Sequence, residues 1–343
     1  MGTREGPLEG FTEINTMKNI WKGKIVFITG ANGFLGTHLT KRALLQKAKV
    51  IALIKEDIPH SVFNQEKLHH EVEVIKGTLN DSGLINSVFK GNKIALCLHV
   101  GAQAIVGTAN QSPIHTLKSN IEGTWNVLEA GRAYGIGALI VASSDKAYGD
   151  HIKLPYTEDS PLRALHPYDA SKACADILSR TYAQTYTMPI AVTRCANIYG
   201  PGDCNFSRIV PDTMQSIIDD KNPIIRSDGT PVRDYIFVDD VVTAYFLLAE
   251  KMYLRKIRGG EAFNFGTGSP ISVLNLVKKI IQVSGKVRLK PVVLGKSVLK
   301  GEIQKQYLSS RKAGRLLGWK SEYTLERGLR STFQWYTHSN VLK

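Results

Sequence analysis

Lys24-Ile-Val-Phe-Ile-Thr-Gly-Ala-Asn-Gly-Phe-Leu-Gly36 is the stretch that decides the fold of this 343-residue chain. Its beginning is a short run of apolar and β-branched residues, as expected of a buried strand. The run leads directly into three closely spaced glycines, and a helical pattern follows to about Leu45. Glycines in this setting allow a tight turn and a close approach of backbone to a pyrophosphate at the positive end of a helix. The stretch therefore predicts a dinucleotide-binding turn.

Further β-type runs alternate with helical patterns after this turn, at residues 50–54, 72–75, 94–100, 138–143 and 190–194. Repeated strand, helix, strand units predict an α/β fold with a doubly wound parallel sheet of the Rossmann type. The alternation loosens from about Pro201, and we expect a smaller C-terminal substrate lobe there. Helices are expected in it at residues 208–219, 235–250, 272–283 and 309–317.

This organisation divides the chain into three parts. We expect a flexible leader at 1–21, a dinucleotide-binding domain at 22–200 and a region, 201–343, that forms mainly the substrate lobe.

The chain has a net charge of +14 and a pI of about 9.5. An anionic partner is therefore expected, either nucleic acid, acidic lipid or a phosphorylated small molecule. The basic residues are scattered and form no arginine-rich tract or zinc-finger spacing, so a solvated basic surface is favoured over a nucleic-acid partner.

No apolar run reaches the ~20 residues that cross a bilayer, and no signal-peptide pattern precedes residue 22. The four cysteines lack Cys-x-x-Cys spacing, which indicates reduced, structural thiols. We expect a cytoplasmic protein with no membrane partner.

Tyr168-Asp-Ala-Ser-Lys172 supplies a tyrosine and a lysine on one helical face. A phenol has a free pKa of about 10, and the positive charges of an oxidised nicotinamide ring and a lysine ammonium both favour its ionised form. Tyr168 is therefore a candidate base. The alternative is an exposed helical pair without a joint role.

The second strand ends at Ile54 and Lys55, where an acid for the adenosine ribose normally stands. A lysine there can hold a 2′-phosphate, so the residue favours NADP over NAD. Glu56 and Asp57 just beyond keep both cofactors open, as does the possibility that Lys55 is only a surface residue.

Five ordered blocks of the sequence resemble the extended short-chain dehydrogenase/reductase family, the NAD-dependent epimerases and dehydratases that act on nucleotide sugars. The blocks cover residues 29–36, 143–148, 168–172, 194–201 and 233–240. The resemblance implies an enzyme that binds a nucleoside-diphosphate sugar and holds no metal.

Within that family, the segment after the fifth strand separates the reaction types, and this chain has Ser144-Asp145-Lys146. Two ionisable residues after the serine resemble the 4,6-dehydratases, and the Asp-Lys form is similar to the CDP-glucose 4,6-dehydratases and some UDP-N-acetylglucosamine dehydratases. The resemblance implies Lys146 as the base at C5, Asp145 as the acid at the departing 6-hydroxyl, and Ser144, Tyr168 and Lys172 as the group that oxidises C4. A 4-epimerase, which needs only the Tyr-Lys pair, is the alternative, as is a surface Asp-Lys pair without function.

The resemblance also implies the binding residues. Cofactor contacts are expected from Gly30, Asn32, Gly33, Phe34, Leu35, Gly36, Lys55, Thr78, Leu79, Ala102, Tyr168 and Lys172. Thr78 departs from the family pattern, because an aspartate that meets adenine usually stands there.

Substrate contacts are expected from Gln103, Asn197, Arg208 and Arg233. Arg233 matches an arginine that pairs with the sugar diphosphate, and a guanidinium fork suits that group. A turn cap for Asn197 and a surface salt bridge for Arg208 are the alternatives. Segments 208–211 and 307–313 resemble CDP-glucose dehydratases and favour a cytosine base.

Related enzymes pair through two helices of each subunit, and residues 119–134 and 170–187 are expected to form such helices in a homodimer. The remaining alternative is a non-catalytic dinucleotide-sensing or RNA-binding protein. Intact Ser144, Tyr168 and Lys172 argue against it.

Overall fold

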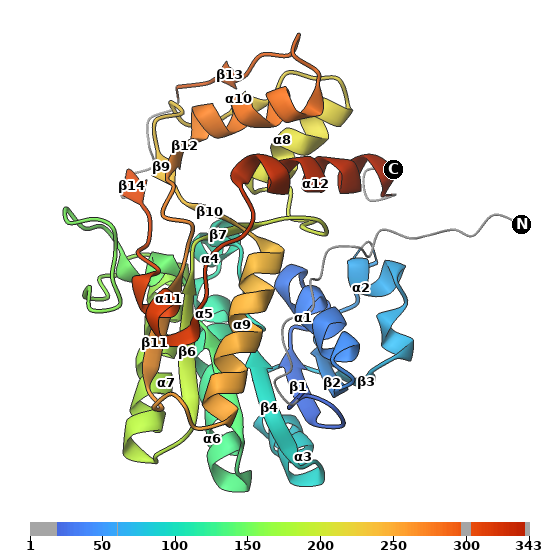
Figure 1. Ribbon diagram of the computed structural model, residues 1–343, viewed down its shortest axis with the longest axis vertical. Coiled ribbons are helices and arrows are strands. Elements are labelled where there is room, and N and C mark those ends of the chain that lie inside the picture. The colour runs from blue at the N-terminus through green and yellow to red at the C-terminus, as the bar shows by residue number, and fades with distance from the viewer. Residues whose placement is uncertain (1–18, 60, 296–302, 340–343) are drawn as a thin grey trace, which may run out of the picture.

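The computed structural model describes residues 19–59, 61–295 and 303–339. Its centre is a seven-stranded, wholly parallel sheet (Figure 1). From edge to edge the strands are β11 (Glu261–Phe265), β6 (Ile190–Cys195), β5 (Ala138–Ala142), β4 (Ile94–His99), β1 (Ile25–Thr29), β2 (Lys49–Ile54) and β3 (Glu73–Lys76). The order reverses beside β1, which confirms the predicted doubly wound sheet.

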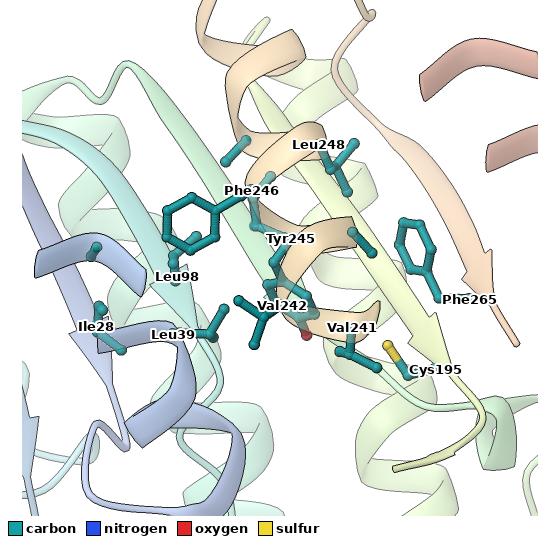
Figure 2. Packing of buried hydrophobic residues seen from close by; sticks show 14 of the residues in the cluster. Ile28, Leu39, Leu98, Cys195, Val241, Val242, Tyr245, Phe246, Leu248 and Phe265 are labelled. Atoms are coloured by element: carbon teal, nitrogen blue, oxygen red, sulfur yellow. The ribbon is translucent and has the colours of Figure 1, made fainter. Parts of the chain in front are cut away.

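Helices cover both faces of the sheet because the strands are apolar on both sides. Val26 and Ile28 of β1 pack toward α1 (Phe34–Leu45) and α9 (Val238–Tyr253), whereas Phe27 packs toward α3 (Ser82–Gly91), α6 (Gly123–Tyr134) and α7 (Pro167–Thr185). Figure 2 shows the apolar side chains of α9 lying over strands on both sides of β4.

The lobe lies beyond one end of this sheet (Figure 1). Its helices α8 (Ile209–Ile218), α10 (Val273–Ser284) and α12 (Leu325–His338) share one apolar core. Three small sheets complete it: β7 (Asn197–Tyr199) with β10 (Tyr235–Phe237), β8 (Ile224–Ile225) with β13 (Val292–Val293), and β9 (Val232–Arg233) between β12 (Ile271–Ser272) and β14 (Lys305–Gln306).

The short connecting helices lie mainly in the loops of the sheet domain. They are α2 (Val62–Gln65), η1 (Leu68–His70), α4 (Val106–Gln111), α5 (Pro113–Leu117), the π-helical turn η2 (Lys118–Glu122), the 3₁₀ turn η3 (Asp145–Tyr148) and α11 (Arg311–Leu317).

Three expectations about this architecture need correction. Tyr235–Phe237 was expected to begin a helix and is instead a strand, because it pairs with β7 before α9 begins. Residues 238–265 fall within the expected lobe region, yet α9 and β11 belong to the sheet domain. Trp21, expected in the flexible leader, is 3% exposed and its ring lies against that of Phe246. Residues 1–18 of that leader lie outside the described residues.

In the described part of the chain, no helix is both long and apolar enough to cross a bilayer. The same residues contain no cluster of three or more His, Cys, Asp or Glu side chains that could hold a metal ion.

Candidate active site

The predicted site residues follow the carboxyl ends of neighbouring strands in the sheet. The strands are parallel, so the segments that follow them emerge on the same side. The glycine turn follows β1, Ala102 and Gln103 follow β4, Ser144 follows β5 and Asn197 follows β6. Residues far apart in the sequence are therefore brought to the carboxyl ends of neighbouring strands.

The glycine turn has the form that a dinucleotide pyrophosphate requires. Gly30 has a φ of 66°, and a Cβ there would lie 2.7 Å from the Cα of Gly101. A Cβ on Gly36 would overlap the carbonyl oxygen of Gly30. Among the described residues, no side chain caps the start of α1 at Gly33, so its first N–H groups are available to an anion. These features fit the predicted cofactor.

Replacing Gly36 with alanine is expected to abolish dinucleotide binding, because the new methyl group must push the turn and α1 apart. The overlap is with backbone, so we also expect a loss of about 1–3 kcal/mol in stability. Calorimetric titration with NAD and NADP, with thermal melting alongside, measures both effects. Gly91→Ala is the control, since nothing lies within 4 Å of a Cβ there; equal behaviour of the two variants contradicts the proposed cradle.

The loops beside the glycine turn, where the sequence predicts the adenosine, are held by hydrogen bonds and packing. Asn32 Nδ2 donates to the carbonyl oxygen of Glu56 at 2.7 Å, which joins the loops after β1 and β2. Lys55 Nζ lies 2.9 Å from Glu56 Oε1 and its side chain is 55% exposed. Leu79 packs against Gly101. Lys55 thus directly follows the end of β2, as predicted, and its ammonium already has a carboxylate partner in Glu56.

Tyr168 and Lys172 lie near the start of α7, beside the end of β5. Lys172 Nζ donates to the carbonyl oxygen of Ala142 at 2.8 Å, and burial lowers its pKa to about 8. The Tyr168 side chain is half-buried. Desolvation raises its pKa to about 12, while Arg208 and a hydrogen bond with Ser144 act in the opposite direction. The sequence analysis expected a nicotinamide ring and the Lys172 ammonium to lower this pKa, whereas in the protein alone burial dominates and the charges that act on the phenol are those of Arg208, Asp145 and Asp169.

The Asp145 carboxyl lies in the 3₁₀ turn after β5 and is 3% exposed. Ser144 Oγ donates to its Oδ1 at 3.1 Å, whereas Oδ2 has no hydrogen-bond partner in the described chain. Burial raises the pKa of Asp145 to about 6, against the opposing effects of Lys146 and Ser144. Lys146 also acts electrostatically on Asp169, next to Tyr168. The carboxyl of Asp145 and the amine of Lys146 therefore lie near Tyr168 and its neighbour Asp169.

The raised pKa of Asp145 links this carboxyl to stability. An acid whose folded pKa exceeds its unfolded value stabilises the fold at low pH, and that stability is lost as pH rises from about 4 to above 6. The rise from 3.8 to about 6 corresponds to about 3 kcal/mol for this buried group. We expect Asp145→Asn to be more stable than the wild type at pH 8, by an amount that shrinks toward pH 4. Urea unfolding at both pH values checks this, and a pH-independent difference contradicts it.

Two of the four predicted substrate residues, Arg208 and Arg233, act electrostatically on this site. Arg208 lowers the pKa of Tyr168 electrostatically and also pairs with the buried Asp203, with 3.0 Å between Nη1 and Oδ2. Arg233 is 9% exposed and acts on the pKa of Asp145. Asn197 Nδ2 donates to the carbonyl oxygen of Asp234 at 3.1 Å.

Gln103 is held by Asn120, a residue that the sequence analysis did not single out. The Gln103 N–H donates to Asn120 Oδ1 at 2.7 Å, and Asn120 Nδ2 donates to Ser171 Oγ at 2.8 Å. Asn120 lies in the π-helical turn η2, and Ser171 Oγ donates to the carbonyl oxygen of Tyr168. The amide therefore ties the loop after β4 to the helix that carries Tyr168.

His99 connects the same region to the glycine turn. Thr124 Oγ1 donates to the carbonyl oxygen of Asn120, so it accepts from His99 Nε2 at 3.0 Å. His99 Nδ1 then accepts from Thr29 Oγ1 at 2.8 Å, and Thr29 Oγ1 accepts from the Gly101 N–H. Burial lowers the pKa of His99 to about 3. The ring, neutral with its proton on Nε2, is a structural bridge between β1, β4 and α6.

A buried polar network holds the 3₁₀ turn η3 from behind. Tyr148, at the end of that turn, donates its hydroxyl to Asn264 Oδ1 at 2.7 Å and accepts from Arg194 Nη1 at 2.8 Å. Arg194 makes a two-pronged bond to Asp176, at 2.7 and 2.9 Å, and both side chains are at most 1% exposed. The turn is thereby fixed to β6, α7 and β11.

Fold and site together define a dinucleotide-binding Rossmann protein of the short-chain dehydrogenase/reductase class. Comparison with known proteins makes this more specific. The chain belongs to the NAD dependent epimerase/dehydratase family, whose model matches residues 26–266.

Relatives include both reaction types that the sequence suggested. A dTDP-D-glucose 4,6-dehydratase of Dictyostelium discoideum is 32% identical over 276 residues, which are 76% of this chain and 62% of that relative. A UDP-glucose 4-epimerase of Thermotoga maritima, solved with UDP-glucose, superposes with a TM-score of 0.83 at 28% identity and covers 91% of this chain and 98% of its own. A dTDP-glucose 4,6-dehydratase of Bacillus anthracis, solved with NAD, superposes with a TM-score of 0.82 at 26% identity. The match covers 94% of this chain and 100% of that one.

Proposed function

We propose that this protein is a nucleotide-sugar 4,6-dehydratase that converts a nucleoside-diphosphate hexose to its 4-keto-6-deoxy form and water. The observation that carries the proposal is the buried Asp145 carboxyl, with a pKa of about 6 and an unpartnered oxygen, beside Lys146 and the Tyr168 group. An epimerase has no use for an acid at this place, whereas elimination of a hydroxyl requires one.

The glycine turn, Lys55, Leu79 and Lys172 would hold the dinucleotide. When bound, it supplies the redox chemistry by taking a hydride from C4 of the sugar and returning it to C6. Tyr168, as phenolate, accepts the proton of the 4-hydroxyl. Ser144 hydrogen-bonds the same oxygen, and the Lys172 ammonium favours the phenolate.

The 4-keto group acidifies the proton on C5. Lys146 Nζ takes that proton, and the electron pair of the C5–H bond forms the C5–C6 double bond. Asp145 donates its proton to the 6-hydroxyl, which leaves as water when the C6–O bond breaks. When C6 receives the hydride, the Lys146 ammonium gives its proton back to C5, and the proton that Tyr168 took from the 4-hydroxyl balances the one that Asp145 lost. A carboxyl with a pKa of about 6 keeps a protonated fraction near neutral pH that an ordinary aspartate lacks.

For the substrate we propose CDP-glucose, on the similarity of segments 208–211 and 307–313 to CDP-glucose dehydratases; UDP-, GDP- and dTDP-hexoses are the alternatives. Arg233, Asn197, Arg208 and Gln103 would hold the diphosphate and the hexose. For the dinucleotide we propose NADP over NAD, supported by the place of Lys55 at the end of β2.

One experiment tests these assignments together. The purified protein is denatured, the released dinucleotide is identified by mass, and the native protein is screened with CDP-, UDP-, GDP- and dTDP-glucose for a 4-keto-6-deoxy product. A product that still contains its C6 oxygen, or C4 epimers alone, contradicts the proposal. Steeply salt-dependent nucleic-acid binding without turnover of any nucleotide sugar supports the binding-protein alternative.

We also propose that the chain forms a homodimer through α6 and α7. These helices pack together and still expose large apolar side chains, with Trp125 44% and Ile177 53% exposed. Ile177→Glu is expected to yield a monomer in analytical ultracentrifugation, because a buried unpaired carboxylate opposes association. Ile152→Glu is the control, since this isoleucine is fully exposed on a loop; an unchanged dimer in Ile177→Glu contradicts the proposed interface.

A further inference from the structure

Gln306 lies at the end of β14 in the small sheet of the lobe. Its Cα partner in the neighbouring strand β9 is Arg233. Partner residues of parallel strands point to the same side of a sheet, and exposure agrees with this pairing. Gln306 is 0% and Arg233 is 9% exposed, whereas Lys305, one residue earlier, is exposed. The Gln306 amide and the Arg233 guanidinium therefore share the inward face.

That inward face looks toward the candidate active site. Arg233 acts electrostatically on Asp145 and on Tyr156. The chain beside Gln306 also contacts this region, because the Tyr156 N–H donates to the carbonyl oxygen of Tyr307 at 3.0 Å. The segment that follows Gln306 therefore lies against Tyr156, whose phenol is within electrostatic range of Asp145.

The Gln306 amide has no partner for either of its ends. Both Nε2 and Oε1 are buried, and neither makes a hydrogen bond within the part of the chain that the structure describes. A buried amide without partners destabilises a fold, so such groups are rare and need an explanation. Asp145 Oδ2 is likewise buried and makes no hydrogen bond to the described residues. Two buried polar groups near Arg233 therefore lack what a polar ligand would supply.

We infer that the Gln306 amide binds the hexose of the nucleotide sugar, donating from Nε2 and accepting at Oε1; this inference rests on the proposed function. A carboxamide offers both a donor and an acceptor, which matches sugar hydroxyls. A diphosphate offers acceptors alone and is the natural partner of Arg233. The pairing of Gln306 with Arg233, a residue that acts on Asp145, the proposed acid at C6, also favours the hexose over the base.

The test compares Gln306→Met with the wild type and with Gln304→Met. Methionine keeps the length of the side chain but removes both polar ends, and Gln304 carries an exposed amide two residues away. Each protein is titrated calorimetrically with CDP-glucose and with CDP. If the wild type binds another of the UDP, dTDP or GDP pairs more tightly, that pair is used.

For Gln306→Met we expect the Kd of the nucleotide sugar to rise about tenfold or more. The Kd of the nucleoside diphosphate should stay within about twofold, as should both values for Gln304→Met. Equal loss of both ligands assigns the amide to the base or diphosphate and overturns the inference, and so does unchanged binding of the sugar.

Two further results separate the possible failures. Wild-type protein that binds none of the four nucleotide sugars contradicts the proposed function itself. The melting temperature of ligand-free Gln306→Met should equal or exceed that of the wild type, because two unpaired groups are gone. If this variant does not fold, Gln306→Glu, which keeps the shape and loses the donor, is titrated in its place and should also lose the sugar selectively.

Discussion

Replacing Tyr168 with phenylalanine is expected to lower kcat about 10³-fold while the Kd of the nucleotide sugar changes by no more than about threefold. The phenol oxygen is the proposed acceptor of the 4-hydroxyl proton, and general-base catalysis contributes roughly 10²–10⁴-fold. The ring itself, which fills the same space, is retained. Steady-state assay of the 4-keto product and calorimetric titration of the sugar measure the two quantities.

Tyr253→Phe is the matched control for this change. Tyr253 ends α9 and packs against the backbone at Gly137, next to the start of β5, at the opposite edge of the sheet from Tyr168. We expect its kcat to remain within about twofold of the wild type. A Tyr168→Phe variant with nearly full activity contradicts the oxidation of C4 by this residue, and with it every later step.

Separate substitutions of Lys146 and Asp145 should divide the elimination into its two halves. Lys146→Ala is expected to stop exchange of the C5 proton with deuterated solvent, because no amine remains to remove it. Asp145→Asn is expected to allow that exchange but to slow loss of the 6-hydroxyl about 10²-fold or more, since an amide donates no proton. Mass spectrometry and NMR of the sugar follow both events, and each variant should still oxidise C4.

The same pair distinguishes a dehydratase from a 4-epimerase. An epimerase inverts C4 without touching C5 or C6, so both variants should then keep nearly full activity on their sugar. Lys153→Ala, in an exposed part of the loop that follows, is the control for loss of a nearby positive charge. Wild-type protein that exchanges no C5 proton with any of the four sugars contradicts the dehydratase proposal directly.

The sheet could be predicted from the sequence because its signals are local. Each inner strand is a short apolar run, and the glycine turn after Thr29 fixes where the first one ends. The later strands, from residue 235 on, were harder to predict. Tyr235–Phe237 is apolar and runs without a break into α9, so only its pairing with β7 shows that it is a strand. β11 joins β6 across more than sixty residues of sequence, a contact that no local pattern encodes.

The candidate site was predictable where the residue types themselves suggest chemistry, as at Tyr168 and Lys172. The groups that hold those residues were not. Asn120 interrupts an otherwise ordinary helical pattern, and its bonds to Gln103 and Ser171 depend on a π-helical turn. Gln306 is one glutamine in a polar stretch, and only its complete burial beside Arg233 sets it apart.

The network behind η3 bears on how such a protein can acquire a different reaction. Tyr148, Arg194 and Asp176 clamp the turn from the interior, while Asp145 and Lys146 project from its other end. The two side chains proposed to act on the sugar are therefore different from the residues that hold the turn in place. Exchange of those two side chains removes no hydrogen bond of the clamp, so under the roles proposed above the reaction type would change while the framework that holds the turn stays the same.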